Sequence, residues 1–189
     1  MKLILALFLL LSGCLQSPGE RDAQDPDKPP GERPASAAET KEGDFVYRLV
    51  SEQGTYDDGK DVRLYAELIF TGPEESVTIY HAASPFYFPI RETTRGYDIG
   101  FMMNQPLLHT ELRRHVPLRE TYVKSGGFSE QDEREYVEFM KRFWKEGFPE
   151  GEYVANGYAD FFVGNGPDDA NKIDYRIGAA VSFSVKGVR

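Results

Sequence analysis

The sequence predicts a mainly β protein, with an antiparallel immunoglobulin-like β-sandwich and one inserted amphipathic helix. Apolar and polar side chains alternate between residues 62 and 70 and again between 173 and 185, which is the period of a half-buried strand. Turn-forming residues recur about every 8 to 12 positions, as in a sandwich of about seven to nine short strands. Only residues 129–147 show the spacing of an amphipathic helix.

The strand pattern begins at Asp44, and its first clear element runs from Val62 to Phe70. A turn at residues 71–75 leads to a second strand with Val77, Ile79 and His81 on one side. The strongest alternation comes last, from Ile173 to Val185, and a Gly- and Asp-rich connection joins it to an expected strand before it. The remaining strands are expected at 86–90, 97–101, 107–112, 118–123 and 152–163.

The helix is expected to begin at an N-cap, Ser129, and to end at Gly147, two residues before Pro149. We expect its apolar stripe to pack across an end of the sandwich or a sheet edge, and a partner's groove is the alternative. The stripe consists of Tyr136, Val137, Met140, Phe143 and Trp144.

The N-terminus has the pattern of a secretory signal. Lys2 precedes nine apolar residues, Leu3 to Leu11, too short a run to cross a membrane. The segment Leu11-Ser12-Gly13-Cys14 resembles the lipobox of bacterial lipoproteins, which implies that residues 1–13 are removed and that Cys14 is diacylated. The alternatives are a cleaved signal in which Cys14 is incidental, and a mis-assigned start codon.

Residues 14–43 are expected to form the acylated cysteine and a disordered spacer, rich in proline and charge and without aromatic residues. As a flexible coil the spacer would reach about 30 Å. The folded domain is then expected to span residues 44–189. This organisation places the domain at the outer face of the cell membrane, attached through the acyl chains of Cys14.

The charge balance disfavours several partners. The net charge is −9, with 22 Lys and Arg against 31 Asp and Glu, which disfavours nucleic acid and anionic lipid surfaces. Cys14 is the only cysteine, so its acylation leaves no thiol for a disulfide, a metal site or a nucleophile.

Beyond the lipobox, the chain resembles a group of uncharacterised lipoproteins from Gram-positive bacteria, over roughly residues 62–163. The segments that carry this resemblance are Leu64 to Leu68, Ile79 to Phe86, Arg95 to Tyr97 and Phe148 to Tyr153. No biochemical activity is assigned to this group, so the resemblance implies none for this chain. The segment Pro149 to Tyr153 is also similar to a late strand in the immunoglobulin-like intracellular proteinase inhibitors of bacilli.

Signatures of catalysis and of cofactor binding are missing. The sequence contains no GxSxG, SxxK, P-loop, GxGxxG or HExxH pattern. His81, His109 and His115 are not spaced as metal ligands. The sequence therefore predicts no cofactor and no metal, although the oxygen-rich loop from Asn165 to Asp174 leaves calcium open.

An aromatic and methionine-rich region is the best candidate for a binding surface, because such residues in irregular segments are common at recognition surfaces. The alternative is that they fill the core between two sheets. Met102 and Met103 are consecutive, so both cannot face one sheet interior. The candidate residues are Phe86, Tyr87, Tyr97, Phe101, Met102 and Met103.

These observations predict a lipid-anchored, non-catalytic binding or assembly module for an unidentified protein or envelope component. Inhibition of an extracytoplasmic protease through an exposed loop is the second hypothesis. A hydrolase that uses carboxylates such as Glu67 and Glu92 is the third.

Overall fold

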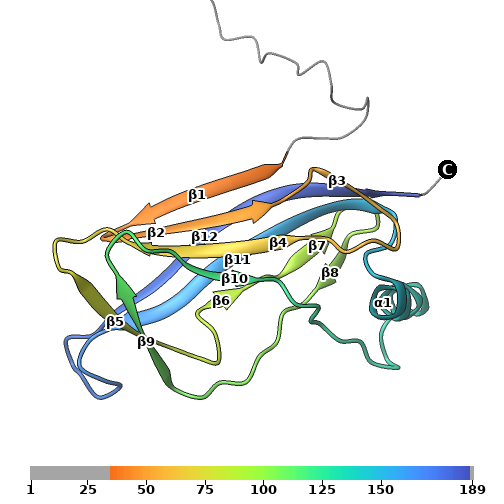
Figure 1. Ribbon diagram of the computed structural model, residues 1–189. Helices are drawn as coiled ribbons and strands as arrows, with labels where there is room; N and C mark the ends of the chain where they lie inside the picture. The colour runs from red at the N-terminus through yellow and green to blue at the C-terminus, as the bar shows by residue number, and fades with distance from the viewer. Residues whose placement is uncertain (1–34, 188–189) are drawn as a thin grey trace, which may run out of the picture. The chain divides into compact units, whose positions relative to one another are not determined.

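The structure is a computed structural model, and it describes residues 35–187, of which 49% lie in strands. The predicted signal at 1–13, Cys14 and most of the expected spacer lie outside the described residues. Figure 1 shows one sheet lying over the central strands of a second sheet, with the only helix of the described residues at one end.

The first sheet is antiparallel, and its strands have the order β1-β2-β4-β10. The alternation that predicted β4 is confirmed, since Leu64, Ala66 and Leu68 are all fully buried. Gly43 adopts φ 54° in the tight turn between the first two strands, a conformation that favours glycine. The strands are β1 (Ser36–Glu42), β2 (Phe45–Ser51), β4 (Leu64–Phe70) and β10 (Leu118–Thr121).

Strand β1 corrects the expected domain boundary at Asp44. The segment Ser36–Glu42 was expected within the disordered spacer, but it pairs with β2 along its whole length. Its inward side chains are small: Ala38 packs against the core, and the Thr40 hydroxyl donates a 2.7 Å hydrogen bond to the Gly178 carbonyl. Backbone pairing thus orders a segment that contains little apolar surface.

The second sheet is mixed and is centred on a long hairpin. Strands β11 and β12 pair from Gly151 opposite Val185 to Val163 opposite Ile173. Strand β3 runs parallel to β12, an element that the sequence did not indicate. The strands are β3 (Thr55–Asp57), β5 (Ser76–His81), β6 (Phe86–Tyr87), β7 (Ile90–Glu92), β8 (Tyr97–Ile99), β9 (Leu108–Arg113), β11 (Gly151–Val163) and β12 (Ile173–Lys186).

Aromatic side chains join the two sheets across the core. The ring of Phe45 in β2 lies 4.9 Å from the ring of Phe161 in β11, and also 4.9 Å from that of Tyr175 in β12. The alternation along β12 buries Ile177 as expected, whereas Ile173 at the hairpin end remains 56% exposed. The inner faces of both sheets therefore share one core.

Helix α1 (Arg134–Glu146) is shorter at its start than the sequence predicts. Ser129 does not cap it: the Ser129 hydroxyl accepts a hydrogen bond from the Gln131 amide in a preceding turn, and Glu133 occupies the N-cap position without a side-chain bond. The predicted end at Gly147 is confirmed, where the Gly147 amide bonds to the Phe143 carbonyl at 3.0 Å.

The apolar face of α1 packs against the end of the second sheet. Phe139 lies 5.1 Å from the ring of Tyr97 in β8, and Phe143 lies 5.0 Å from that of Phe148. The stripe is thus rotated relative to the sequence pattern, because Phe139 is buried while Trp144 is 43% exposed. The helix closes one end of the core.

Candidate binding surface

The structure separates the six residues predicted to form a binding surface. Phe86 is fully buried, with its ring 6.3 Å from that of Tyr47. It is a core residue and is not available to a partner, which corrects that prediction. It is buried because it lies on the inward face of β6, where this short strand pairs with β11.

Tyr97 is half-buried beneath the helix. Its ring lies 5.4 Å from that of Tyr136 and 5.1 Å from that of Phe139, both in α1. Tyr97 therefore attaches the helix to β8, and the structure does not bring it together with the methionines.

Tyr87, Phe101 and Met103 are half-buried and attach the loop of residues 100–107 to the second sheet. The ring of Tyr87 stacks on Tyr158 at 4.8 Å and meets Phe101 edge-on at 6.1 Å. The side-chain amide nitrogen of Gln105, Nε2, donates hydrogen bonds to the Tyr87 hydroxyl at 3.3 Å and to the Met103 carbonyl at 3.4 Å. These half-buried residues hold the loop against the second sheet and leave little of their own surface for a partner.

Met102 is the prominent side chain of this loop, with 70% of it exposed. Its backbone is fixed at both ends, because its amide donates to the Ser125 hydroxyl at 2.9 Å and that hydroxyl donates to the Met102 carbonyl at 3.2 Å. Ser125 belongs to a second loop, residues 122–133, between β10 and α1. One serine thus links the two loops side by side.

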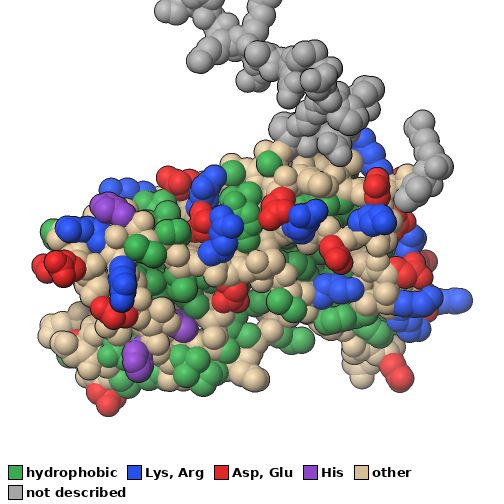
Figure 2. All heavy atoms as spheres, in the orientation of Figure 1, with side chains coloured by type: hydrophobic (Ala, Val, Ile, Leu, Met, Phe, Trp, Pro, Cys, Tyr) green, Lys and Arg blue, Asp and Glu red, His purple; other side chains and the backbone are tan. Residues whose placement is uncertain are grey.

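Two further apolar side chains of the second loop are exposed. Val123 is 73% exposed and Phe128 is 41% exposed. We call Met102, Val123 and Phe128 the loop surface. Figure 2 shows hydrophobic side chains gathered below the band of acidic and basic side chains on the first sheet. Sequence reasoning missed Val123 and Phe128, although the pair Gly126-Gly127 between them indicated an irregular loop.

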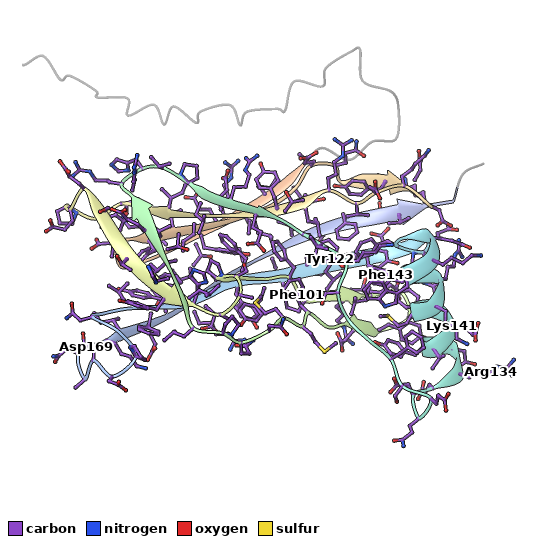
Figure 3. The ribbon with its side chains drawn as sticks, turned by 60° about the horizontal axis from the view of Figure 1, so that its bottom comes forward. Phe101, Tyr122, Arg134, Lys141, Phe143 and Asp169 are labelled. Atoms are coloured by element: carbon purple, nitrogen blue, oxygen red, sulfur yellow. The ribbon has the colours of Figure 1, made fainter. Side chains whose placement is uncertain are left out.

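The loop surface rests on a buried aromatic floor. Phe88 is 1% exposed, and its ring lies 5.6 Å from Phe101 in the first loop and 5.8 Å from Tyr122 in the second. In Figure 3, Phe101 and Tyr122 lie next to each other between the strands and α1. Burial raises the pKa of Tyr122, so its hydroxyl stays neutral in this floor.

The second loop is also attached to the helix. The Lys124 ammonium donates to the carbonyls of Phe143 at 3.4 Å and Trp144 at 3.1 Å, where the helix dipole is negative. The Tyr136 hydroxyl donates to the Asp98 carbonyl at 2.8 Å. Burial raises the pKa of Tyr136, which keeps this donor protonated. Both loops are therefore held in one arrangement before any partner binds.

The carboxylates considered for hydrolysis lie in different sheets and have structural partners. Glu67 in β4 accepts a hydrogen bond from Arg119 Nε at 2.9 Å and forms an ion pair with a terminal nitrogen of the same guanidinium at 2.7 Å. Glu92 in β7 is fully buried and accepts bonds from the amides of Thr94 and Arg95 in the following turn. The structure does not bring the two together.

His81 is buried and forms two hydrogen bonds. Its Nδ1 lies 2.8 Å from the Ala82 carbonyl and must donate, so its Nε2 accepts from the Thr110 hydroxyl, also at 2.8 Å. Burial lowers the pKa of His81, and the Ala82 carbonyl and the Glu120 charge oppose this shift. His81 is thus a neutral strand residue with both nitrogens occupied.

The oxygen-rich loop uses its central carboxylate internally. Asp169 accepts bonds from the amides of Asn165 and Asn171, each at 2.8 Å, and these bonds lower the pKa of Asp169. Figure 3 shows Asp169 at the opposite end of the domain from the helix residue Arg134. Within residues 35–187, no three His, Cys, Asp or Glu side chains are grouped to hold a metal ion.

Comparison with protein-family models, with curated proteins and with solved structures found no match. In the part of the chain that the structure describes, no helix is long and apolar enough to cross a membrane.

Proposed function

We propose that this chain is a lipid-anchored, extracytoplasmic, non-catalytic binding module, whose loop surface contacts a protein or envelope component. The observation that carries the proposal is the double hydrogen bond of Ser125 to Met102, which fixes two loops so that Met102, Val123 and Phe128 are exposed together. In this proposal the predicted signal directs export, and the acylated Cys14 attaches the domain to the outer face of the cell membrane.

Exposed apolar side chains on rigid loops favour recognition for two reasons. Water contact with Met102 and Val123 is unfavourable, and a partner that covers them gains roughly 25 cal/mol per Å² of apolar area. The attachment of both loops to the floor and to α1 reduces the conformational entropy that binding would otherwise cost. Methionine also adapts its shape to a partner surface.

The finer fold assignment belongs to the same proposal. We propose that the two sheets form an immunoglobulin-like sandwich, a scaffold that commonly presents binding loops at its ends. The shared aromatic core between β2 and the hairpin β11–β12 supports this assignment.

The recognition proposal is tested by affinity capture from solubilised envelope, with the full chain in mild detergent as bait. The test variant is Met102→Ser/Val123→Ser. The control is Val116→Ser/Ile173→Ser, which removes two other exposed apolar side chains, 55% and 56% exposed against 70% and 73% in the test pair. We expect a component that the wild type and the control retain and the test variant loses. Equal retention by all three baits would contradict the proposal.

The anchor is tested separately with Cys14→Ala. We expect this variant to lose incorporation of radiolabelled palmitate and to leave the membrane fraction, since a diacylated cysteine is the only membrane contact in the proposal. A variant that still labels and stays membrane-bound would contradict it.

A specific feature of the first loop favours protease inhibition as the second candidate. Residues 100–107 contain no regular secondary structure, and the Met102 backbone is fixed at both its amide and its carbonyl. A protease would meet this segment in a fixed conformation. Inhibition would be stoichiometric and lost in Met102→Asp but kept in Val116→Asp. Secreted proteases that the wild type does not slow would exclude this candidate.

A further inference from the structure

The second sheet contains a break beside the loop of residues 100–107. Strand β5 pairs with β11 only at Phe162 and Val163, and β6 pairs with it at Tyr158 and Ala159. Between them the chain bends away, and the Asp160 amide donates to the Pro85 carbonyl at 2.8 Å. The break opens a slot of about 280 Å³.

Two stacked aromatic pairs stand on either side of the slot. Tyr80 and Phe162 stack at 4.9 Å with their planes 8° apart, and Tyr87 and Tyr158 stack at 4.8 Å and 6°. The ring faces are used in stacking. One face of each ring is therefore covered, and Tyr80, Phe162 and Tyr87 belong to the slot lining.

The carboxylates and the Gln105 carbonyl of the slot are hydrogen-bond acceptors, and the hydroxyls of Tyr80 and Tyr87 can both donate and accept. Asp160 and Asp174 line the slot, together with Gln105. The Gln105 amide nitrogen already donates to Tyr87 and Met103, so its carbonyl oxygen is left as an acceptor. The buried His81 has both ring nitrogens occupied. A ligand that supplies only donors complements this lining.

The two acidic side chains are weakly neutralised. Asp174 has no ion pair among residues 35–187, and the Asp160 carboxylate lies 3.8 Å from the Arg176 guanidinium. Arg176 itself lies over the outer face of Tyr158 at 4.1 Å, and Lys172 lies over Phe162 at 4.8 Å. Neither cation lines the slot.

We propose that the slot binds one basic side chain, Lys or Arg, of a protein partner. A guanidinium or ammonium group supplies only donors, and the volume of about 280 Å³ lies at the small end of ligand pockets, which suits a single side chain. Gln105, Pro106 and Leu107 connect the slot to Met102 along one loop. The inference therefore rests on the proposed function, in which a protein contacts that loop.

The test is a titration of the nitrogen-15-labelled full chain in mild detergent with N-acetyl-arginine amide, followed by amide chemical shifts. N-acetyl-citrulline amide is the neutral control probe of nearly equal shape. The test variant is Asp160→Asn/Asp174→Asn. The control variant, Glu74→Gln/Glu135→Gln, makes the same change in net charge outside the slot. Unfolding midpoints of both variants establish that each is folded.

We expect saturable shifts at Tyr80, Gln105 and Asp160 with the arginine probe, and at least about tenfold weaker binding of the citrulline probe. The test variant should bind the arginine probe about tenfold more weakly, and the control variant should match the wild type. Equal binding of both probes, no saturable shift, or equal binding by both variants would overturn the proposal. All variants keep Met102 and Val123, so this result does not depend on capture through the loop surface.

Discussion

At the centre of the core, the Tyr47 hydroxyl is buried, has no hydrogen-bond partner among residues 35–187, and lies close to the position that a Cβ atom on residue 157 would take. That Cβ would be 2.5 Å from the hydroxyl oxygen and 3.0 Å from Leu49. Burial raises the pKa of Tyr47, so the group remains a neutral, unpaired hydroxyl. Gly157 is thus required by packing against the opposite sheet.

The pair can be tested with a double-mutant cycle. We expect Gly157→Ala to lower the free energy of unfolding by about 1–3 kcal/mol through overpacking. Tyr47→Phe should leave it unchanged or raise it by about 1 kcal/mol, because it removes an unsatisfied buried group. Urea unfolding should show Gly157→Ala to be less harmful in the Tyr47→Phe background. Additive effects would show that the hydroxyl is not what excludes a side chain at 157.

The lowered pKa of His81 is expected to make the stability of the domain depend on pH. Because burial holds its pKa below the ordinary 6.5, the unfolded chain binds a proton that the folded chain does not as the pH falls through that value. The stability that neutral His81 contributes is complete above 6.5 and is lost as the pH falls toward its lower folded pKa.

Urea unfolding between about pH 7.5 and about pH 5.5 measures this loss. We expect a decline with falling pH in the wild type, and a shallower decline in His81→Gln, which does not titrate. His115→Asn is the control, since His115 is exposed and at φ 62°, a conformation that asparagine tolerates. A decline that is identical in wild type and His81→Gln would refute the assignment.

Among the elements, β1 depends most on its tertiary surroundings. Its sequence has little apolar content, and only pairing with β2 and contact with the core order it. Two adjacent alanines distinguish its faces, because Ala38 packs against the core while Ala37 is exposed. The strand alternation makes them a matched pair.

We expect Ala38→Asp to destabilise the domain by about 1–3 kcal/mol, because it places a charge against the core. Ala37→Asp should change stability by less than about 0.5 kcal/mol. Thermal unfolding followed by circular dichroism measures both. If both substitutions were neutral, Ser36–Glu42 would be part of a spacer, as the composition had indicated.

Helix α1 shows why element boundaries are difficult to read from a sequence. Ser129 and Asp132 have side chains that commonly cap helices. Here the Ser129 amide donates to the Asp132 carboxylate at 2.6 Å, and the Asp132 amide donates to the Ser129 carbonyl at 3.2 Å. They form a separate turn before the helix, in which the Ser129 hydroxyl accepts a hydrogen bond from the Gln131 amide. The same residues can cap a helix or form a turn, so their chemistry alone does not fix where the helix begins.

At the scale of the whole molecule, the aromatic contacts of Phe45 with Phe161 and Tyr175 join the sheets, and Phe148 connects the helix to the same core. We expect residues 35–187 to unfold in one cooperative transition. Trp144, the only tryptophan, reports on the helix by fluorescence, and far-ultraviolet circular dichroism reports on the strands. Coincident urea curves are expected, whereas an earlier fluorescence transition would show that α1 detaches independently.

The candidate binding surface could be predicted only in part. The irregular segment with Met102 was visible in the sequence, because consecutive methionines break the strand alternation. Val123 and Phe128 were not, since their loop is distant from Met102 in the chain and is joined to it by the hydroxyl of Ser125. Phe86 is aromatic, as residues at recognition surfaces often are, but it lies on the inward face of a strand. Composition does not distinguish these two positions.

The β class, the longest strands and the one helix of the described residues are predictable from the sequence alone, because strand and helix periodicity are local properties of the chain. The folded chain was needed to establish that β1 belongs to the domain, that β3 pairs in parallel, and which aromatic residues are exposed. Those outcomes depend on contacts between residues far apart in the chain, such as Thr40 with Gly178 and Met102 with Ser125. A local pattern contains no record of such partners.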